Sequence, residues 1–330
     1  MKKIQSLTGM LDLYDNQDGD NLSAKIFYVE KKIREIFLNY KLQEIRTPIL
    51  EDANLFKRSV GNLSDIVNKE IYSFEDRNDK LIALRPEGTA SVIRAIIEKK
   101  LDQTPHKLWY MGPMWRYERP QKGRYRQFNQ AGIEILGIPE GLPEYELISI
   151  VCSLISEFGL KDCLIKINHL GTPEDKESFC NALVDYLEPL KAEMGEKDIE
   201  RLNTNPLRIL DTKDKKTQNL LQNAPSIKDF ISSDSIKLLE SIKNEFSDIC
   251  NIHIDYSLVR GLDYYSGFVF EALSSDLGAQ DSFLGGGRYD HLCSKLGGKD
   301  MPSIGLAIGL ERFAELVQVK DLETKMVSFI

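Results

Sequence analysis

The sequence is poor in cysteine and histidine and contains no long apolar stretch. Its five cysteines are odd in number and dispersed, and none belongs to a Cys-x-x-Cys pair. This argues against a disulfide framework or a cysteine zinc site and is typical of a reducing cytoplasm. The four histidines are equally scattered, so no metal ligated by the protein is expected. Neither a membrane span nor an N-terminal signal peptide is predicted, because no segment is apolar and long enough.

Acidic residues outnumber basic ones, and the formal net charge is −8. That balance argues against a protein that coats nucleic acid without specificity. One segment differs: residues 116–128, RYERPQKGRYRQF, contain several Lys and Arg beside a single acid, Glu118. A basic segment in an acidic chain indicates a local surface for an anionic partner.

Hydrophobic spacing predicts helices and strands in the first half of the chain. Apolar groups recur at helical intervals over 23–41, whereas 42–52 is rich in β-branched residues around Pro48 and predicts extended structure. A hairpin is expected around Asn78-Asp79. Two further strands are expected on either side of the basic segment, and 143–160 returns to a helical pattern.

The second half predicts a helical insertion followed by more strands. Charged helical segments dominate 172–245, which we expect to interrupt a core formed by 1–171 and 246–330. The last part predicts strands and then a helix over 305–319. Strands in blocks without regular βαβ alternation favour an α+β fold with an antiparallel sheet flanked by helices.

Three arginine-centred clusters stand far apart in the sequence, at Arg116, Arg260 and Arg312. Arginine presents a rigid fork of donors that matches phosphate oxygens, and it keeps its charge at neutral pH. A single cluster is more often a solvated face or a structural ion pair, such as Arg260 with Asp263. Three of them beside LRPEGTA (84–90) and GGGRYD (285–290) favour an anion site.

These motifs resemble those of the class II aminoacyl-tRNA synthetases. WRYER ahead of QF (115–128) is similar to motif 2 of that class, GLAIGLERF (305–313) to motif 3, and LQEIRTPILED (42–52) to the weaker motif 1. LVRGLDYYSGFVFE (258–271) and GGGRYD resemble the two signatures of histidyl-tRNA synthetases. The resemblance extends from Gly9 to about Val319 and implies a class II synthetase-type sheet.

The resemblance implies activation of histidine by ATP, followed by transfer of histidine to the 3′ end of tRNA(His). It implies that Arg116 holds the α-phosphate, and that Arg260 lies between this phosphate and the substrate carboxylate as the second catalytic group. Because charge builds on the phosphoryl oxygens during the reaction, fixed cations are suited to it. The ATP-binding residues expected from the resemblance are Arg116, Glu118, Arg124, Phe128 and Arg312, with Mg²⁺ accompanying the ATP.

The histidine pocket implied by the resemblance consists of acceptors and aromatic side chains. Glu87, Thr89 and Gln130 would receive the ammonium group, while Glu134 and Tyr265 would hold the two imidazole nitrogens, with Tyr264 lining the pocket and Arg260 on the carboxylate. A buried carboxylate at Glu134 would reject apolar side chains. The glycines at 285–287 would permit close approach of the backbone to a ligand, or mark a β-bulge.

The basic segment is the expected contact with tRNA, with Arg119, Gln121 and Lys122 as candidates. The family implies a homodimer formed through motif 1 and no association with a membrane. Relatives often carry histidine where this chain has Asn129.

Two expectations concern the C-terminal part and the function class. The family normally continues into an α/β anticodon-binding domain, and MVSFI (326–330) predicts the first strand of such a domain in an engineered catalytic fragment, in which activation would survive and tRNA charging would be weak. The alternative is a natural short paralogue, such as the regulatory subunit that partners ATP phosphoribosyltransferase. Such subunits typically lose the catalytic signatures, which are intact here.

Overall fold

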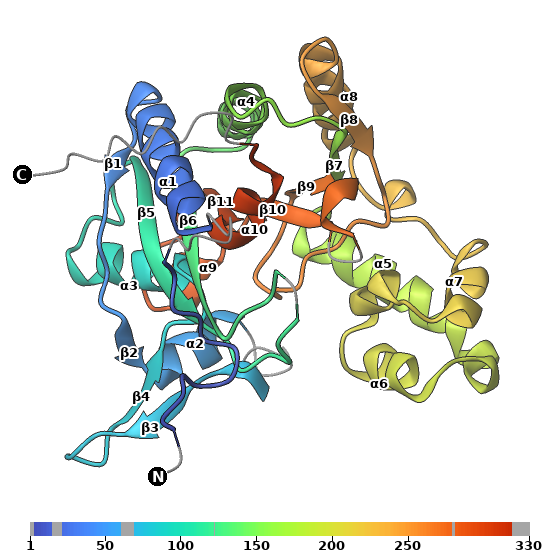
Figure 1. Ribbon diagram of the computed structural model, residues 1–330. Helices are drawn as coiled ribbons and strands as arrows, with labels where there is room; N and C mark the ends of the chain where they lie inside the picture. Colours follow the sequence, from blue (N-terminus) through green and yellow to red (C-terminus); the bar gives the residue numbers. More distant parts are fainter. Residues whose placement is uncertain (1–2, 15–21, 61–68, 122, 279–280, 319–330) are drawn as a thin grey trace, which may run out of the picture.

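The computed structural model describes residues 3–14, 22–60, 69–121, 123–278 and 281–318 (Figure 1). It shows a body built around a large sheet, with a lobe of short helices at one side. The strand expected over 326–330, and the candidate contact Lys122, lie outside the described residues.

The described part of the chain contains an eight-stranded sheet in the order β1-β5-β6-β11-β10-β9-β7-β8. All neighbouring strands pair antiparallel, except β1 with β5 and β7 with β8. The predicted α+β fold with an antiparallel sheet is therefore confirmed. The strand bounds are β1 Gln43–Glu44, β5 His106–Trp115, β6 Gln127–Leu136, β7 Cys163–His169, β8 Asn251–Ile254, β9 Phe268–Ser274, β10 Ser282–Arg288 and β11 Ser303–Gly309.

Helices cover one face of this sheet and bury the main core against it (Figure 1). Strand β6 shows the division between the faces, because its side chains alternate. Its odd-numbered residues, among them Ile133 and Ile135, pack into the helix-covered core, whereas Gln130 lines a cleft on the opposite face. The covering helices are α1 Leu22–Asn39, α4 Leu142–Glu157, α8 Ser233–Phe246 and α10 Leu310–Leu316.

A smaller sheet lies beside the opposite face, in the order β2-β4-β3. The hairpin expected around Asn78-Asp79 is confirmed, since β3 and β4 pair antiparallel and Asp79 adopts a φ of 58° in the turn. The remaining elements of this side are β2 Leu50–Asp52, α2 Ala53–Val60, β3 Ser73–Glu75, β4 Leu81–Leu84, α3 Thr89–Glu98 and α9 Leu292–Lys295, whereas the turn η5 Ser275–Leu277 packs against α10 on the helix-covered side.

The predicted helix over 305–319 is wrong in its first part. Residues 303–309 form strand β11, which lies between β6 and β10 and pairs with both, and the helix begins only at Leu310. The apolar segment 304–308 is compatible with a buried helix or with a strand that has a neighbouring strand on each side. Periodicity alone does not distinguish the two. Pairing on both edges decides for the strand.

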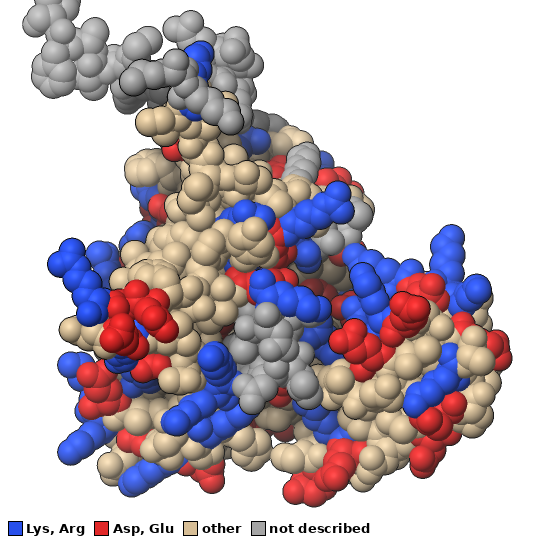
Figure 2. Space-filling view, turned by 90° about the horizontal axis from the view of Figure 1, so that it is seen from below, with Lys and Arg blue, Asp and Glu red and all other residues tan. Residues whose placement is uncertain are grey.

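The lobe consists of short helices around a core of its own, which includes Phe179, Leu183 and Ile209. Its surface mixes Lys and Arg with Asp and Glu (Figure 2, right). Helix α8, most of which falls within 172–245, packs mainly against the large sheet and α4, although its Ile236 also contacts the lobe core. The predicted domain boundaries at residues 171 and 245 stay a prediction. The lobe elements are α5 Pro173–Leu187, η2 Glu188–Glu193, α6 Glu196–Thr204, η3 Pro206–Asp211, α7 Lys215–Leu221 and η4 Ile227–Asp229.

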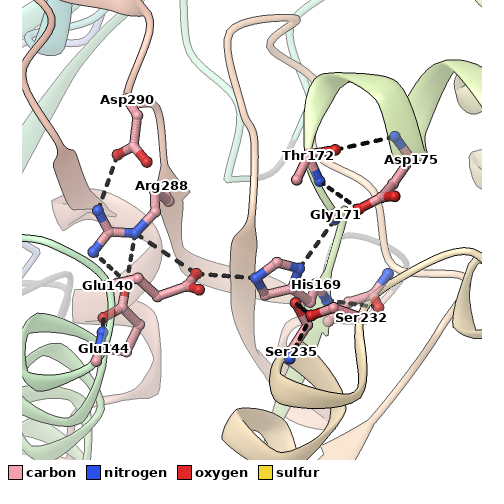
Figure 3. Close-up of polar contacts among 12 residues, drawn as sticks. Glu140, Glu144, His169, Gly171, Thr172, Asp175, Ser232, Ser235, Arg288 and Asp290 are labelled. Carbon is pink, nitrogen blue, oxygen red and sulfur yellow. Dashed lines mark hydrogen bonds and ion pairs between the residues drawn. The ribbon is translucent and has the colours of Figure 1, made fainter.

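A buried ion cluster around Arg288 ties the end of β10 to the start of α4 (Figure 3). The Arg288 guanidinium lies 2.5 Å from Glu144 Oε1 and 2.9 Å from Asp290 Oδ1. His169 Nε2 lies 2.9 Å from the Glu140 carboxylate, and His169 Nδ1 accepts a hydrogen bond from the Gly171 amide. Because Nδ1 accepts, the ring proton sits on Nε2 and is donated to Glu140.

Replacing Arg288 with methionine should destabilise the protein by about 3–5 kcal/mol, because the Glu144 side chain, which is 0% exposed, would lose its main cation. Urea unfolding gives the free energy of unfolding directly. The matched control is Lys237→Met, which breaks the exposed pair with Asp234 and should cost about 1 kcal/mol or less. Similar losses in both variants would contradict the buried role of Arg288.

Candidate functional site

A cleft with a volume of about 500 Å³ opens on the face of the sheet that the main helices leave uncovered. Its floor comes from β6, β9, β10 and β11, and its walls come from the basic segment and the loop before β9. Arg116, Arg260 and Arg312, remote in sequence, all line it. The other predicted site residues that line it are Glu87, Thr89, Glu118, Arg124, Phe128, Gln130, Tyr264 and Tyr265.

Three of the arginines gather at one end of the cleft. Arg116 follows β5, donates from Nε to the Pro86 carbonyl at 2.9 Å and places its guanidinium 5.3 Å from the centre of the Phe128 ring. Arg124 lies 3.1 Å from Glu118. Arg312, in the first turn of α10, donates to the carbonyls of Gly123 and Ser282.

The arginines at this end lie close enough to influence one another. Burial lowers the pKa of Arg312, and the neighbouring Arg124 and Arg116 lower it further, whereas Glu118 and Glu315 oppose the shift. Like charges held close together in a partly dehydrated cleft repel one another. The arrangement therefore favours binding of an anion that neutralises several guanidinium groups at once.

Arg260 stands farther along the cleft and is held by a carboxylate on the sheet. Its Nη1 donates to Glu271 Oε1 at 2.5 Å. Burial lowers the pKa of Arg260, but Glu271, together with Tyr265 and Tyr264, outweighs this effect and the pKa is raised, so the side chain stays charged. The ion pair with Asp263 considered from the sequence is replaced by this one, and Asp263 instead accepts a hydrogen bond from Asn205.

The glycines of GGGRYD make room for side chains and neighbouring strands. A Cβ at Gly285 would overlap the Arg260 guanidinium, and one at Gly286 would overlap the Gly305 carbonyl oxygen on β11. The strand irregularity in this region falls between Ser282 and Leu284, so the three glycines are not themselves a bulge. A larger residue at Gly285 would displace Arg260.

A buried acidic group, Glu134 of β6, lies behind the lining of the cleft: it does not itself line the cleft, but Thr89 and Tyr289, which bind it, do. Its side chain accepts hydrogen bonds from the Thr89 hydroxyl at 2.7 Å and from the Tyr289 hydroxyl. A Cβ at Gly305 would overlap one of its oxygens, so this glycine leaves the space that the carboxyl group fills. Burial raises the pKa of Glu134 to about 8, although Tyr289 and Thr89 favour the ionised form.

Further acceptors surround the same end of the cleft. Both oxygens of Glu87 accept backbone N–H groups at the start of α3, from Thr89 at 2.6 Å and Ala90 at 2.9 Å. Gln130 Oε1 is buried, and no hydrogen-bond partner for it occurs among the described residues. Tyr264 and Tyr265 belong to the loop of Arg260, and the centroids of their rings lie 4.8 Å apart. This end is suited to a ligand that carries N–H donors.

Two of the predicted tRNA contacts are not part of the lining of this cleft. Arg119 and Gln121 are exposed and do not line it. Asn129 is turned toward α10, where its backbone and side-chain N–H groups donate to Glu311 at 2.8–2.9 Å.

Comparison with known proteins agrees with these observations. The family model described as histidyl-tRNA synthetase matches residues 21–313. A histidine–tRNA ligase of Picosynechococcus sp. is 46% identical over 327 residues, covering 96% of this chain and 74% of the relative. One from Francisella philomiragia is 45% identical, covering 96% and 75%.

The chain belongs to the histidyl-tRNA synthetase family.

A solved structure agrees with this assignment. Histidyl-tRNA synthetase from S. aureus, determined in the apo state, is 33% identical, with a TM-score of 0.75 over 96% of this chain and 76% of that chain. None of the helices in the described part of the present chain combines the length and the apolar character needed to cross a membrane.

Several lining residues of this histidyl-tRNA synthetase family member were missed by sequence reasoning. Tyr289 was quoted within GGGRYD, but only the glycines were given a role there. Glu271 stands in the other signature, LVRGLDYYSGFVFE, and its strand alternation could have placed it on the same face as the cleft. Asp211 and Lys213 line the cleft from the lobe, and no sequence motif had indicated them.

The raised pKa of Glu134 predicts a pH dependence of stability. Because the folded-state pKa lies above the usual value of 4.5, the native protein holds a proton that the unfolded chain releases between about pH 4.5 and 8. The free energy of unfolding of the wild type should therefore fall, relative to that of Glu134→Gln, as pH rises through this window. The slope cannot exceed about 1.4 kcal/mol per pH unit. Urea unfolding of both proteins at several pH values measures this slope. If the free energies of unfolding of the wild type and Glu134→Gln change with pH in the same way, the raised pKa of Glu134 is refuted.

Proposed function

We propose that this chain is a histidine–tRNA ligase, which activates histidine with ATP to histidyl-adenylate and pyrophosphate and then transfers histidine to the 3′ end of tRNA(His). The observation that carries the proposal is the convergence of Arg116, Arg260 and Arg312 on one cleft beside buried acceptors, in a chain of this family. The two relatives described above are named as histidine–tRNA ligases, which agrees with this proposal. This activity takes place where proteins are made, so we infer a cytoplasmic location.

The cationic end of the cleft would bind ATP. Arg116 would contact the α-phosphate, while Arg312 and Arg124 would reach the terminal phosphates and relieve their mutual repulsion. Glu118 would accept the adenine amino group, and Phe128, already in contact with Arg116, would stack on the ring.

Arg260 would act during the attack of the histidine carboxylate on the α-phosphorus. Two anions approach each other in this step, and negative charge builds on the phosphoryl oxygens. A fixed guanidinium between them reduces the repulsion between the two anions and stabilises the negative charge on the phosphoryl oxygens. Glu271 holds that guanidinium by Nη1 and leaves its other nitrogens free to contact the ligands.

The end of the cleft around Glu134 would bind histidine. The ammonium group carries three N–H donors, for which Glu87, Thr89 and the unpaired oxygen of Gln130 are suitable acceptors. Glu134 would accept the N–H of one imidazole nitrogen, with Thr89 and Tyr289 fixing the direction of its oxygens. Tyr265 would contact the other nitrogen, and Tyr264 would line the pocket.

Magnesium would arrive with the ATP rather than in a preformed protein site. Among the described residues, no cluster of three or more His, Cys, Asp and Glu side chains is arranged to hold a metal ion. Mg²⁺ commonly uses substrate phosphates with one or two carboxylates, and Glu118 and Glu311 line the cleft near the arginines. When bound, the ion neutralises phosphate charge.

For the transfer step, the exposed Arg119 and Gln121 are our candidates for contact with the tRNA end. Lys122 shares this segment. The regulatory alternative finds less support, because the ATP-side and histidine-side residues are all present and the relatives at 45–46% identity are named as ligases.

Arg260→Ala should reduce histidine-dependent ATP–pyrophosphate exchange at least a hundredfold, because no other cation would stand between the two reacting anions. Isothermal calorimetry should still detect histidine, since its ammonium and imidazole contacts remain. The matched control is Arg46→Ala, whose side chain is 77% exposed and should leave exchange unchanged. Near-normal exchange by Arg260→Ala would remove the proposed mechanism.

We also propose that two copies of the chain pair through the small sheet. Directly opposed residues of antiparallel strands share a face, and the register places Leu50 opposite Leu84 and Phe74 opposite Ile82. This face is largely apolar, although Asp52 also lies on it, opposite Ile82, and among the described residues it is exposed: Leu50 is 45% exposed and Phe74 is 49% exposed. The opposite face carries the buried Ala83. Motif 1, which resembles a dimer-forming segment, contributes Leu50.

Phe74→Lys should convert the dimer to a monomer, because it would place a charge in the apolar contact. Analytical ultracentrifugation measures the change in mass. Ile249→Lys alters another exposed apolar residue, 61% exposed and outside the small sheet, and should leave the dimer intact. A wild-type monomer, or an intact Phe74→Lys dimer, would exclude this interface.

A further inference from the structure

The loop that carries Arg260 lies between the sheet and the helical lobe. Leu258 and Val269, which flank this loop, are buried in the hydrophobic core of the lobe together with residues such as Phe179 and Ile209. Val259 and Tyr265 pack against the same core. The loop therefore rests on the lobe as much as on the sheet.

Within the part of the chain that the structure describes, three polar contacts join the lobe to this loop. Asn205 Nδ2 donates to Asp263 Oδ1 at 2.8 Å, Arg208 Nη1 donates to the Gly261 carbonyl at 3.4 Å, and Lys176 Nζ donates to the Tyr265 carbonyl at 3.3 Å. The first is the shortest and is the one of the three that joins two side chains.

Asn205 is itself firmly placed. It precedes the turn η3, its N–H donates to the Arg201 carbonyl, and its own carbonyl accepts from the Arg208 amide. At the far end of η3, the Thr212 hydroxyl donates to the buried Asp198 at 2.6 Å. The lobe thus presents the Asn205 amide to the loop from a rigid segment.

We propose that Asn205 is a positioning residue for amino-acid activation, because its hydrogen bond to Asp263 fixes the loop that holds Arg260 and Tyr265. The inference rests on the proposed function and extends it to the lobe. ATP-side residues such as Arg116 and Phe128 belong to the hairpin of β5 and β6, and the three polar contacts of the lobe do not reach them. Loss of Asn205 should consequently affect histidine and the chemical step more than ATP binding.

The primary test compares Asn205→Ala with Asn203→Ala in histidine-dependent ATP–pyrophosphate exchange. Asn203 stands two residues earlier in the lobe and accepts from Lys191, away from the loop. We expect Asn205→Ala to lower kcat/KM for histidine about tenfold, as for a lost hydrogen bond to a charged group, with KM for ATP within about twofold of the wild type. Asn203→Ala should match the wild type. Equal losses in both variants, or a change below about twofold for Asn205→Ala, would overturn the proposal.

A second variant, Asn205→Asp, separates this contact from a loss of folding. It sets two carboxyl groups against each other, and such a pair forms a hydrogen bond once one of them is protonated. Asp263 accepts a hydrogen bond from Asn205, and the charged groups that act on it are Arg208, Lys176 and Lys295. Relative to the wild type at each pH, activity should be about tenfold lower at pH 8 and should recover progressively as the pH falls and one of the two carboxyl groups takes up a proton. Asn205→Ala should show a constant ratio, and a constant ratio for Asn205→Asp would count against the contact.

Hydrogen exchange of the backbone amides gives a readout that does not depend on activity. Peptides covering 258–266 should exchange faster in Asn205→Ala than in Asn203→Ala, with other peptides unchanged. If the wild type lacks histidine-dependent exchange of pyrophosphate, the proposed function fails, while this comparison still decides whether Asn205 fixes the loop. Unchanged protection over 258–266 would refute the positioning role.

Discussion

Repulsion between the arginine side chains is the constraint on which the site depends. Arg116, Arg124 and Arg312 gather at one end of a partly buried cleft, where their charges are weakly screened. Backbone carbonyls and Glu118 hold them there without neutralising them fully. A large core is buried on the opposite face of the same sheet. The stability that this core gives to the strands offsets the free energy of repulsion between the cations.

Strand alternation explains how one sheet performs both tasks. Odd-numbered residues of β6 complete the core under the helices, while Gln130 and Glu134 point to the other side. The same geometry accounts for the glycines: Gly285 and Gly305 lie beneath Arg260 and Glu134, and any Cβ there would overlap these side chains. Arg260 and Glu134 therefore each stand over a strand residue that has no side chain.

Much of this could be predicted from the sequence, for identifiable reasons. Helix α1 and the hairpins have clear periodicity and turn residues, and the arginines stand in motifs whose chemistry is recognisable. The strand at 303–309 was missed because an apolar run fits both a buried strand and a helix. Glu271, as the partner of Arg260, and Tyr289, as the partner of Glu134, were missed because the strand order that brings β9, β10 and β6 into one sheet, and the register of their pairing, are not revealed by composition.

The least predictable part is the contribution of the lobe. Its sequence is charged and helical, which by itself indicates only a solvated module. Yet its core continues into Leu258 and Val269, and its segment 205–213 brings Asp211 and Lys213 to the wall of the cleft. A loop that is packed from two sides has fewer alternative conformations, and holding Arg260 in place before the substrates bind reduces the reorganisation needed during reaction. The lobe is thus part of the active-site framework, and whatever moves it should also move the loop of Arg260.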